Sequence, residues 1–152
     1  MANYAKDEFI PKNPEKYSGK YPIIYRSSWE MTLMNVFDTH PNILTWQSES
    51  ISIPYLNPLT GKWTFYIPDF LVVYLDKNNK KHCEIIEVKP AKEDYRYIPE
   101  TRKNGKKEVI SRRTKLMQIV NMAKWKAAAE YCARRGYFFR VMTEKQLFGI
   151  PK

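Results

Sequence analysis

Residues 64–90 read TFYIPDFLVVYLDKNNKKHCEIIEVKP, in which two apolar runs flank a polar break at residues 76–81. The β-branched and aromatic content of both runs predicts strands, and the break predicts the turn of a β-hairpin. Side chains alternate across a strand, so Glu87 and Lys89 share one face of the second strand. Asp69 opens the first strand, and the hairpin places that end beside them. The sequence therefore predicts that two carboxylates and one ammonium meet at one end of the hairpin.

This group of three polar side chains has two interpretations. Two carboxylates can hold a hard divalent cation, and an ammonium beside them can place a water molecule against a phosphate. Alternatively, Pro-Asp is a common strand start, and glutamate and lysine on a strand often form a cross-strand ion pair on a solvated face. Both runs are too apolar for a hairpin that is solvated on two sides. This favours a central sheet with a polar cluster at its edge.

The composition predicts one domain with a sizeable core. The chain has 152 residues, 43% hydrophobic and 14% aromatic, which argues against disorder. Its formal net charge of +10 favours a polyanionic partner. No apolar run approaches the roughly 20 residues of a membrane span, so no membrane partner is expected. Cys83 and Cys132 match no CxxC pattern, which favours an intracellular protein with reduced, buried thiols.

The N-terminus is predicted to form an extended basic arm over residues 1–22, followed by a single domain over residues 23–152. Prolines and a glycine stand among lysines and tyrosines in the arm, and they disfavour regular structure. The arm is either a loose terminus or a segment that lies on DNA or on a partner. The residues do not decide between these alternatives.

A helix is predicted to begin after Ser27 and to run to about Asp38. Ser27 as the N-cap and Glu30 three residues later make a capping box, which precedes an apolar stripe. Glu30 lies at the border of that stripe, where it can also face the sheet. Its carboxylate is interpreted as a cap, as a third metal ligand, or as both, and these residues alone favour the cap.

The remaining strands follow from apolar patterns. Residues 43–53 read as one or two strands, residues 54–61 as a turn, and residues 137–142 as another strand. Threonine and glutamate at positions 143–144 are expected to cap a short final turn.

A long helix is predicted over residues 114–135, with Gly136 just past its end. On this helix Lys124 borders the apolar stripe, and Trp125 points away from it. The stripe consists of Leu116, Ile119, Val120, Ala123, Ala127 and Tyr131.

Residues 91–115 have a large excess of positive charge, interrupted by Pro99 and Gly105. A run of like charges usually indicates a solvated loop. Beside a candidate phosphate-cutting site, an excess of one sign favours contact with nucleic-acid phosphates. The predicted DNA-binding residues are Arg102, Lys103, Lys106, Lys107, Arg112, Arg113, Lys115 and, on the helix, Lys124.

The order of these motifs resembles the PD-(D/E)xK nuclease superfamily. A helix with a glutamate precedes a Pro-Asp strand, a Glu-x-Lys strand, a helix and a strand. The resemblance implies an α/β fold with a restriction-endonuclease-like mixed central β-sheet flanked by helices. It also implies metal-dependent hydrolysis of DNA phosphodiester bonds. Asp69 and Glu87, with Glu30, would bind Mg²⁺, for which Mn²⁺ can substitute, and Lys89 would position the attacking water. All four residues form the implied catalytic set.

Several longer strings, spread over nearly the whole chain, match a second family. They are Asn13–Tyr17, Tyr25–Glu30, Ser48–Glu49, Ile53–Tyr55, Glu87–Pro90, Lys124–Ala128 and Thr143–Glu144. These strings resemble the head completion nuclease family of T-even-type tailed phages. That family implies an endonuclease that acts on double-stranded DNA after packaging, with head and portal proteins as partners. It implies a location in the host cytoplasm or on the virion.

Two alternatives remain at this point. The chain also resembles the transposon-end endonuclease subunit of heteromeric transposases, although that family typically has glutamine where Glu87 stands. A non-catalytic DNA-binding or head-plugging protein is the other alternative. The retention of all four polar positions of the catalytic set counts against it.

Overall fold

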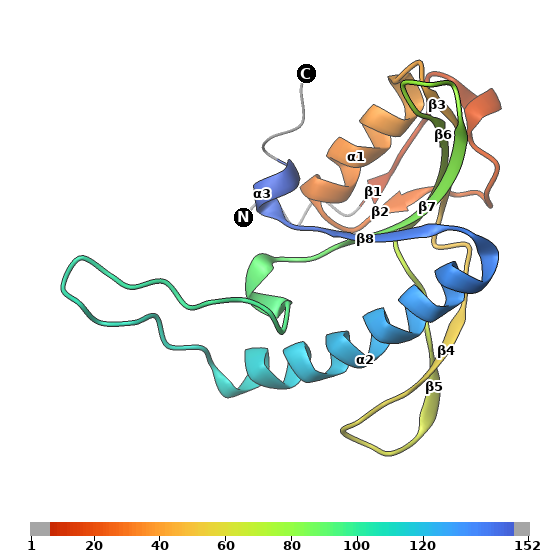
Figure 1. The fold of residues 1–152 in the computed structure, drawn as a ribbon. Coiled ribbons are helices and arrows are strands. Elements are labelled where there is room, and N and C mark those ends of the chain that lie inside the picture. The colour runs from red at the N-terminus through yellow and green to blue at the C-terminus, as the bar shows by residue number, and fades with distance from the viewer. Residues whose placement is uncertain (1–6, 148–152) are drawn as a thin grey trace.

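The computed structural model describes residues 7–147, which form a four-stranded mixed sheet with helices on both faces (Figure 1). The strand order is β3 (Ile43–Ser48), β6 (Phe70–Leu75), β7 (Lys81–Val88) and β8 (Phe138–Met142). The first three strands pair antiparallel, and β8 pairs parallel with β7 after a long helical crossover. The predicted α/β fold with a mixed central sheet flanked by helices is confirmed.

β6 and β7 form a hairpin, with Phe70 opposite Ile86 and Leu75 opposite Lys81. Asp76 stabilises the turn, because its side chain accepts hydrogen bonds from two backbone N–H groups. This turn lies where the sequence places the polar break. The register therefore sets the start of β6 beside the end of β7.

Pro68 divides the first apolar run of the predicted hairpin. Its beginning belongs to another strand, β5 (Trp63–Tyr66), and β6 starts only at Phe70. Proline has no N–H to donate to a ladder, so the chain leaves one sheet and enters the next at this point. Asp69 therefore stands at the junction, immediately before β6.

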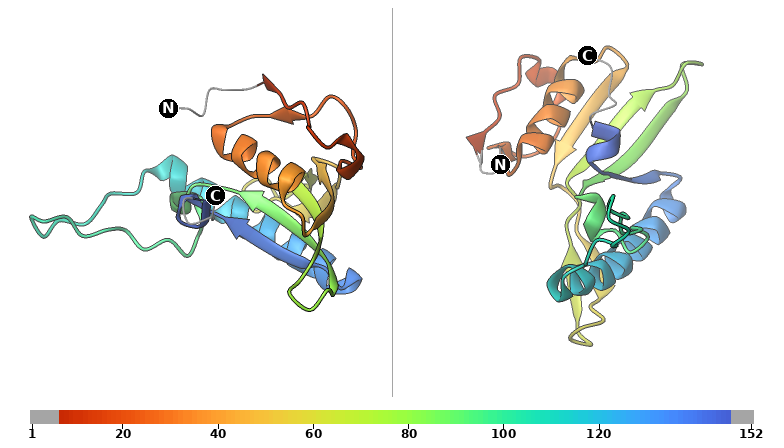
Figure 2. Two further views of the ribbon diagram at one scale, coloured as in Figure 1. Left: turned by 90° about the horizontal axis from the view of Figure 1, so that it is seen from above. Right: turned by 90° about the vertical axis from the view of Figure 1, so that its left-hand side faces the viewer.

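The two faces of the sheet are covered by different helices (Figures 1 and 2). α1 (Ser28–Thr39) and the short α3 (Glu144–Leu147) lie on one face, and α2 (Arg112–Arg135) lies on the other. On the α1 face, Trp46 and Phe70 of the sheet pack with the helix in the larger core. None of the described helices is long and apolar enough to cross a membrane.

β4 (Ile53–Leu56) pairs antiparallel with β5 outside the main sheet. Residues 54–56, predicted as part of a turn, are therefore strand, and the turn is confined to residues 57–62. Pro54 is tolerated because a two-stranded ribbon leaves one side of each strand without ladder partners. The inner face of this hairpin packs on α2.

α2 packs on two sides, and this differs from the predicted single stripe. Trp125, predicted to point away from the core, is buried together with Asn121. Leu116 and Ile119 of the predicted stripe are exposed instead. The helix contacts both the main sheet and the β4–β5 hairpin, so its buried surface is too wide for one row of apolar positions.

Residues 7–22, predicted as part of an extended arm, instead pack on the domain. They include β1 (Asp7–Glu8), which pairs with β2 (Ile24–Tyr25), and a turn of 3₁₀ helix (Pro14–Lys16). The other arm residues, 1–6, lie outside the described part of the chain.

Two contacts tie this N-terminal segment to the body of the domain. Phe9 and Tyr17 are buried, and both rings make edge contacts with Trp46. Asp38 of α1 is buried too, and its carboxylate accepts hydrogen bonds from the backbone N–H groups of residues 12 and 13. These buried residues make the segment part of the folded domain rather than a loose terminus, and contact of its exposed residues with DNA or a partner stays a prediction.

Candidate active site

The three polar residues of the hairpin lie at one end of the sheet. Asp69 precedes β6 and Glu87 lies near the end of β7, on neighbouring strands. The backbone N–H of Val88 donates a hydrogen bond to Oδ2 of Asp69 over 2.8 Å, which fixes this carboxylate beside β7. The Nζ atom of Lys89 lies 3.7 Å from Oε2 of Glu87. The structure thus brings Asp69, Glu87 and Lys89 together.

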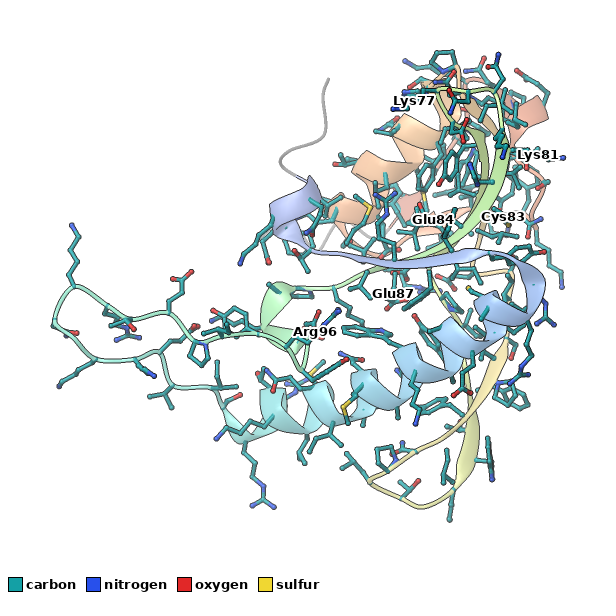
Figure 3. The ribbon with its side chains drawn as sticks, in the orientation of Figure 1. Lys77, Lys81, Cys83, Glu84, Glu87 and Arg96 are labelled. Carbon is teal, nitrogen blue, oxygen red and sulfur yellow. The ribbon has the colours of Figure 1, made fainter. Side chains whose placement is uncertain are left out.

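Glu87 is buried, with 4% of its surface exposed, on the side of the sheet that faces α2 (Figure 3). The hydroxyl of Tyr66 donates a hydrogen bond to its Oε1 over 2.8 Å. Burial raises the pKa of Glu87, and the charge of Asp69 raises it further. Sequence reasoning missed Tyr66, because its contact with Glu87 joins two different sheets and leaves no local pattern.

The pair Asp69 and Glu87 fits a divalent metal ion. Burial is the main cause of the raised pKa of Asp69, while the hydrogen bond from Val88 and the charge of Lys89 oppose it. Two neighbouring carboxylates repel each other when both are ionised, and a bound cation removes that repulsion. Oxygen donors with excess negative charge are the ligands that hard divalent ions prefer. These two residues therefore have the chemistry of metal ligands.

Glu30 lies in the first turn of α1, where it completes a cap. The Ser27 hydroxyl accepts a hydrogen bond from the backbone N–H of Glu30 over 3.1 Å. The Glu30 carboxylate accepts from that hydroxyl over 3.3 Å and from the backbone N–H of Arg26 over 3.4 Å. Burial raises the pKa of Glu30 to about 7, and the charge of Asp69 is the second cause. Glu30 therefore serves the cap and also lies within electrostatic reach of Asp69.

The three predicted metal carboxylates do not form one ligand cluster in this structure. Within residues 7–147, no three His, Cys, Asp or Glu side chains are grouped so that they could hold an ion together. The hydrogen bonds of the cap hold the Glu30 carboxylate at its own helix end. Asp69 and Glu87 are thus the ligand pair that the geometry favours, and the role of Glu30 as a third ligand stays a prediction.

Lys124 of α2 lies at the site, although it was predicted only as a DNA contact. Its Nζ lies 5.9 Å from the ring centroid of Tyr55 and 5.6 Å from that of Tyr66. Burial lowers the pKa of Lys124, and the charge of Lys89 lowers it further. Lys124 is therefore a second cation near Glu87, and its charge lowers the pKa of the Glu87 carboxyl.

A fourth carboxylate, Glu49, lies near the site and is absent from the predicted set. Its φ of 49° is a left-handed conformation that residues other than glycine seldom adopt. Its backbone N–H donates to the carbonyl of Asp69, and its side chain pairs with Arg26 at 2.9 Å. Its charge contributes to the raised pKa values of Asp69 and Glu30. A glutamate directly after an apolar strand is the sequence signal that could have indicated it.

All of the predicted DNA-binding residues except Lys124 occupy a projecting segment and the start of α2. After a turn of 3₁₀ helix (Ala91–Glu93), Tyr95 and Arg96 still line a pocket with α2 and β8, and the residues that follow, up to residue 111, extend away from the domain in Figures 1 and 2. A bridge between Thr101 and Lys107 makes this segment a narrow loop. Seven of the eight predicted residues are exposed, namely Arg102, Lys103, Lys106, Lys107, Arg112, Arg113 and Lys115.

A pocket of about 470 Å³ joins the site to the start of α2. Lys89 and Lys124 line it from the site, Arg112 and Arg113 line it from the helix, and Leu59 lines it from the β4–β5 turn. No aspartate or glutamate lines the pocket among the described residues. The surface beside the carboxylates therefore attracts anions.

Comparison with known proteins gives two similarities. Residues 40–144 match the family model described as TnsA-like endonuclease N terminal. Over 145 residues, the chain is 33% identical to the head completion nuclease of Enterobacteria phage T4, with 92% of this chain and 91% of that protein aligned. The segment that matches the family model contains Asp69, Glu87 and Lys89, and it begins after Glu30. Both similarities are to proteins described as nucleases.

Proposed function

Because this chain belongs to the family of TnsA-like endonuclease N-terminal domains, we propose that it is a Mg²⁺-dependent DNA endonuclease of phage head completion. The two similarities confirm the resemblance to nucleases that the sequence motifs predict, and the chain is a nuclease. The single observation that supports the proposed chemistry is the meeting of Asp69, Glu87 and Lys89 at the ends of β6 and β7.

The proposed mechanism assigns a task to each residue of the site. Asp69 and Glu87 would hold the metal ion, which supplies positive charge against the negative charge that develops on the phosphate oxygens. The N–H of Val88 and the hydroxyl of Tyr66 each donate to one carboxylate oxygen and so keep the pair oriented. Lys89 donates hydrogen bonds to the attacking water and aims it at the phosphorus.

Positive residues around the site support a nucleic-acid substrate. Lys124, Arg112 and Arg113 line the pocket beside Lys89, and further basic residues lie on the projecting segment. Lysine and arginine side chains bind phosphates regardless of base sequence, so we expect cleavage with little sequence preference. Mn²⁺ is expected to substitute for Mg²⁺, since both ions accept oxygen ligands.

Two substitutions separate the roles of Glu30. Glu30→Gln keeps a hydrogen-bonding group at the cap but removes the charge that a Mg²⁺ ligand needs. We expect it to melt close to the wild-type temperature and to lose most of its cleavage activity. Ser27→Ala should do the reverse, with a loss of about 1 kcal/mol of stability and little loss of cleavage. Thermal melting and plasmid cleavage measure the two effects, and normal cleavage by Glu30→Gln would leave Glu30 as a cap alone.

A quadruple variant tests the projecting segment as a DNA contact. Replacing four basic residues of this segment with neutral ones should weaken DNA binding about equally for all duplex sequences. It should also flatten the slope of log K, where K is the binding constant, against the logarithm of the salt concentration by roughly 0.9 per lost phosphate contact. The changed residues are Arg102, Lys103, Lys106 and Lys107.

The matched control neutralises exposed lysines at the β6–β7 turn, at the opposite end of the hairpin from the site. These lysines are Lys77, Lys80 and Lys81, and two of them are labelled in Figure 3. Their loss should leave the salt slope unchanged. An unchanged slope in the quadruple variant as well would make the segment a solvated loop or a protein-docking surface.

A plasmid assay tests the proposed function. The purified chain should convert supercoiled DNA into nicked and linear forms with Mg²⁺ or Mn²⁺, and an excess of EDTA should stop the reaction. Absence of conversion with either ion would contradict the proposed metal-dependent endonuclease and favour a non-catalytic DNA-binding or head-plugging role.

The biological setting is proposed from the relative with which the chain aligns almost throughout. That relative is a phage head completion nuclease. We therefore propose that this chain acts on packaged double-stranded DNA, in contact with head or portal proteins, in the host cytoplasm during virion assembly. Phage assembled in the absence of this protein should accumulate as filled heads that fail to mature.

A further inference from the structure

The outer face of the β4–β5 hairpin is an exposed apolar surface. Leu56 lies opposite Trp63 in the antiparallel register, and Pro54 lies opposite Phe65. Trp63 is 72% exposed and Phe65 is 66% exposed, whereas Tyr66 at the end of the same strand is buried. The hairpin thus buries one face on α2 and presents two aromatic rings on the other. No described segment covers those rings.

This surface lies next to Asp69 of the candidate active site along the chain. Trp63, Phe65 and Ile67 alternate along the chain, all three are exposed, and Asp69 follows two residues later. Alternate residues of a strand are about 6.6 Å apart, since each residue rises about 3.3 Å. β5 ends at Tyr66 and the chain changes sheets at Pro68, so the row of exposed rings ends a few residues before Asp69.

Basic pockets lie on both sides of the hairpin. One is the anion-attracting pocket described above, to which the hairpin contributes Leu59. The other, of about 510 Å³, is lined by Leu56 and Trp63 of the hairpin and by residues of α2 that include Lys126 and Arg134. Glu130 of α2 also lines this second pocket and pairs with Arg134 at 4.0 Å, so the second pocket is less basic than the first. The apolar surface is therefore flanked by groups that bind phosphates.

We propose that the outer face of the β4–β5 hairpin binds the unpaired bases of single-stranded DNA beside the cleavage site. Exposed aromatic rings next to cations suit a single strand, because its bases stack on the rings while its phosphates meet the cations. In a duplex the bases stack on one another and offer no free face to a side chain. A protein partner would match the apolar rings but would gain less from the basic pockets. The inference rests on the proposed function, since it assumes a DNA substrate.

Binding of two probes tests this inference without any cleavage. The probes are a fluorescein-labelled single strand of about 20 deoxythymidines, longer than one stacking site, and a blunt duplex of equal length. Affinities are measured by fluorescence anisotropy in EDTA. The double variant Trp63→Ala/Phe65→Ala should lose at least about tenfold in affinity for the single strand, because each lost stacking contact is substantial. Its affinity for the duplex should change little.

Two control variants sharpen the test. Trp63→Tyr/Phe65→Tyr keeps two rings and should retain most of the single-strand affinity. Ile10→Ala/Leu44→Ala removes two exposed apolar side chains that lie outside both the hairpin and the projecting segment, and it should leave both affinities unchanged. Melting temperatures near wild type are expected for all three, since the changed side chains are exposed.

Several outcomes would overturn the inference. They are an unchanged single-strand affinity in the alanine variant, an equal loss for both probes, or an equal loss in the tyrosine variant. The first outcome would instead favour a protein partner as the ligand of the apolar face. Plasmid cleavage is measured in a separate assay. A failure of the nuclease proposal can therefore be distinguished from a failure of the single-strand binding proposal.

Discussion

Asp69→Asn is expected to lose at least about a hundredfold in Mg²⁺-dependent cleavage, because changing even the outer partners of metal ligands costs about 10–100-fold. The amide is nearly the same size as the carboxylate and can still accept the hydrogen bond from the N–H of Val88. The loss would therefore reflect the missing charge rather than a changed fold. Rates of plasmid nicking at saturating Mg²⁺ measure the effect.

The same variant should be at least as stable as the wild type. Burial raises the pKa of Asp69, so the folded state binds its proton more tightly than the unfolded state does. Stability from this group is present at low pH and is lost as the pH rises through the raised pKa. Asparagine has no such dependence. Without metal, the melting-temperature advantage of Asp69→Asn should thus grow from about pH 4, near the pKa of an unfolded aspartate, to the raised pKa of about 6, and change little above it.

Asp76→Asn is the matched control for this prediction. Asp76 follows the other end of β6, where its side chain stabilises the β6–β7 turn and contacts His82. Its change should leave cleavage intact. Cleavage by Asp69→Asn at the rate of this control would remove Asp69 from the catalytic set.

Lys89→Met should lower the cleavage rate by about 10²–10³-fold, the usual cost of removing one group that stabilises or orients charge in an active site. Methionine keeps most of the side-chain volume and removes the ammonium that lies 3.7 Å from Glu87. Metal binding should persist, because both carboxylates remain and a competing cation is gone. Lys92→Met, which removes a lysine paired with Glu108 on the projecting segment, is the control. A rate within twofold of that control would contradict the assigned role of Lys89.

Local signals predict a large part of the fold and the centre of the site. Ser27 precedes its helix with the expected capping hydrogen bond, and Gly136 ends α2 with a φ of 72°, which glycine adopts readily. The polar break between two apolar runs marks the turn of the hairpin. Once β6 and β7 pair, the register alone puts Asp69 beside Glu87.

The missed features depend on contacts between segments that are distant in the sequence. Trp125 is buried because the β4–β5 hairpin folds onto α2, and no pattern within the helix reveals that second contact. Tyr66 reaches Glu87 across the same interface. The N-terminal segment packs on the domain because the buried carboxylate of Asp38 accepts backbone hydrogen bonds from residues 12 and 13. Composition predicts none of these pairings.

Calorimetric titration of Mn²⁺ into the protein without DNA tests the central claim most directly, because it measures the metal site apart from cleavage. At about pH 8, where more of the raised-pKa carboxyls are ionised, the wild type should bind Mn²⁺ with saturation, and Mg²⁺ should compete. Asp76→Asn should bind like the wild type, and Asp69→Asn should show no saturable binding at the same concentrations. Equal Mn²⁺ affinity in Asp69→Asn and in the wild type would contradict a metal centre built on Asp69 and Glu87.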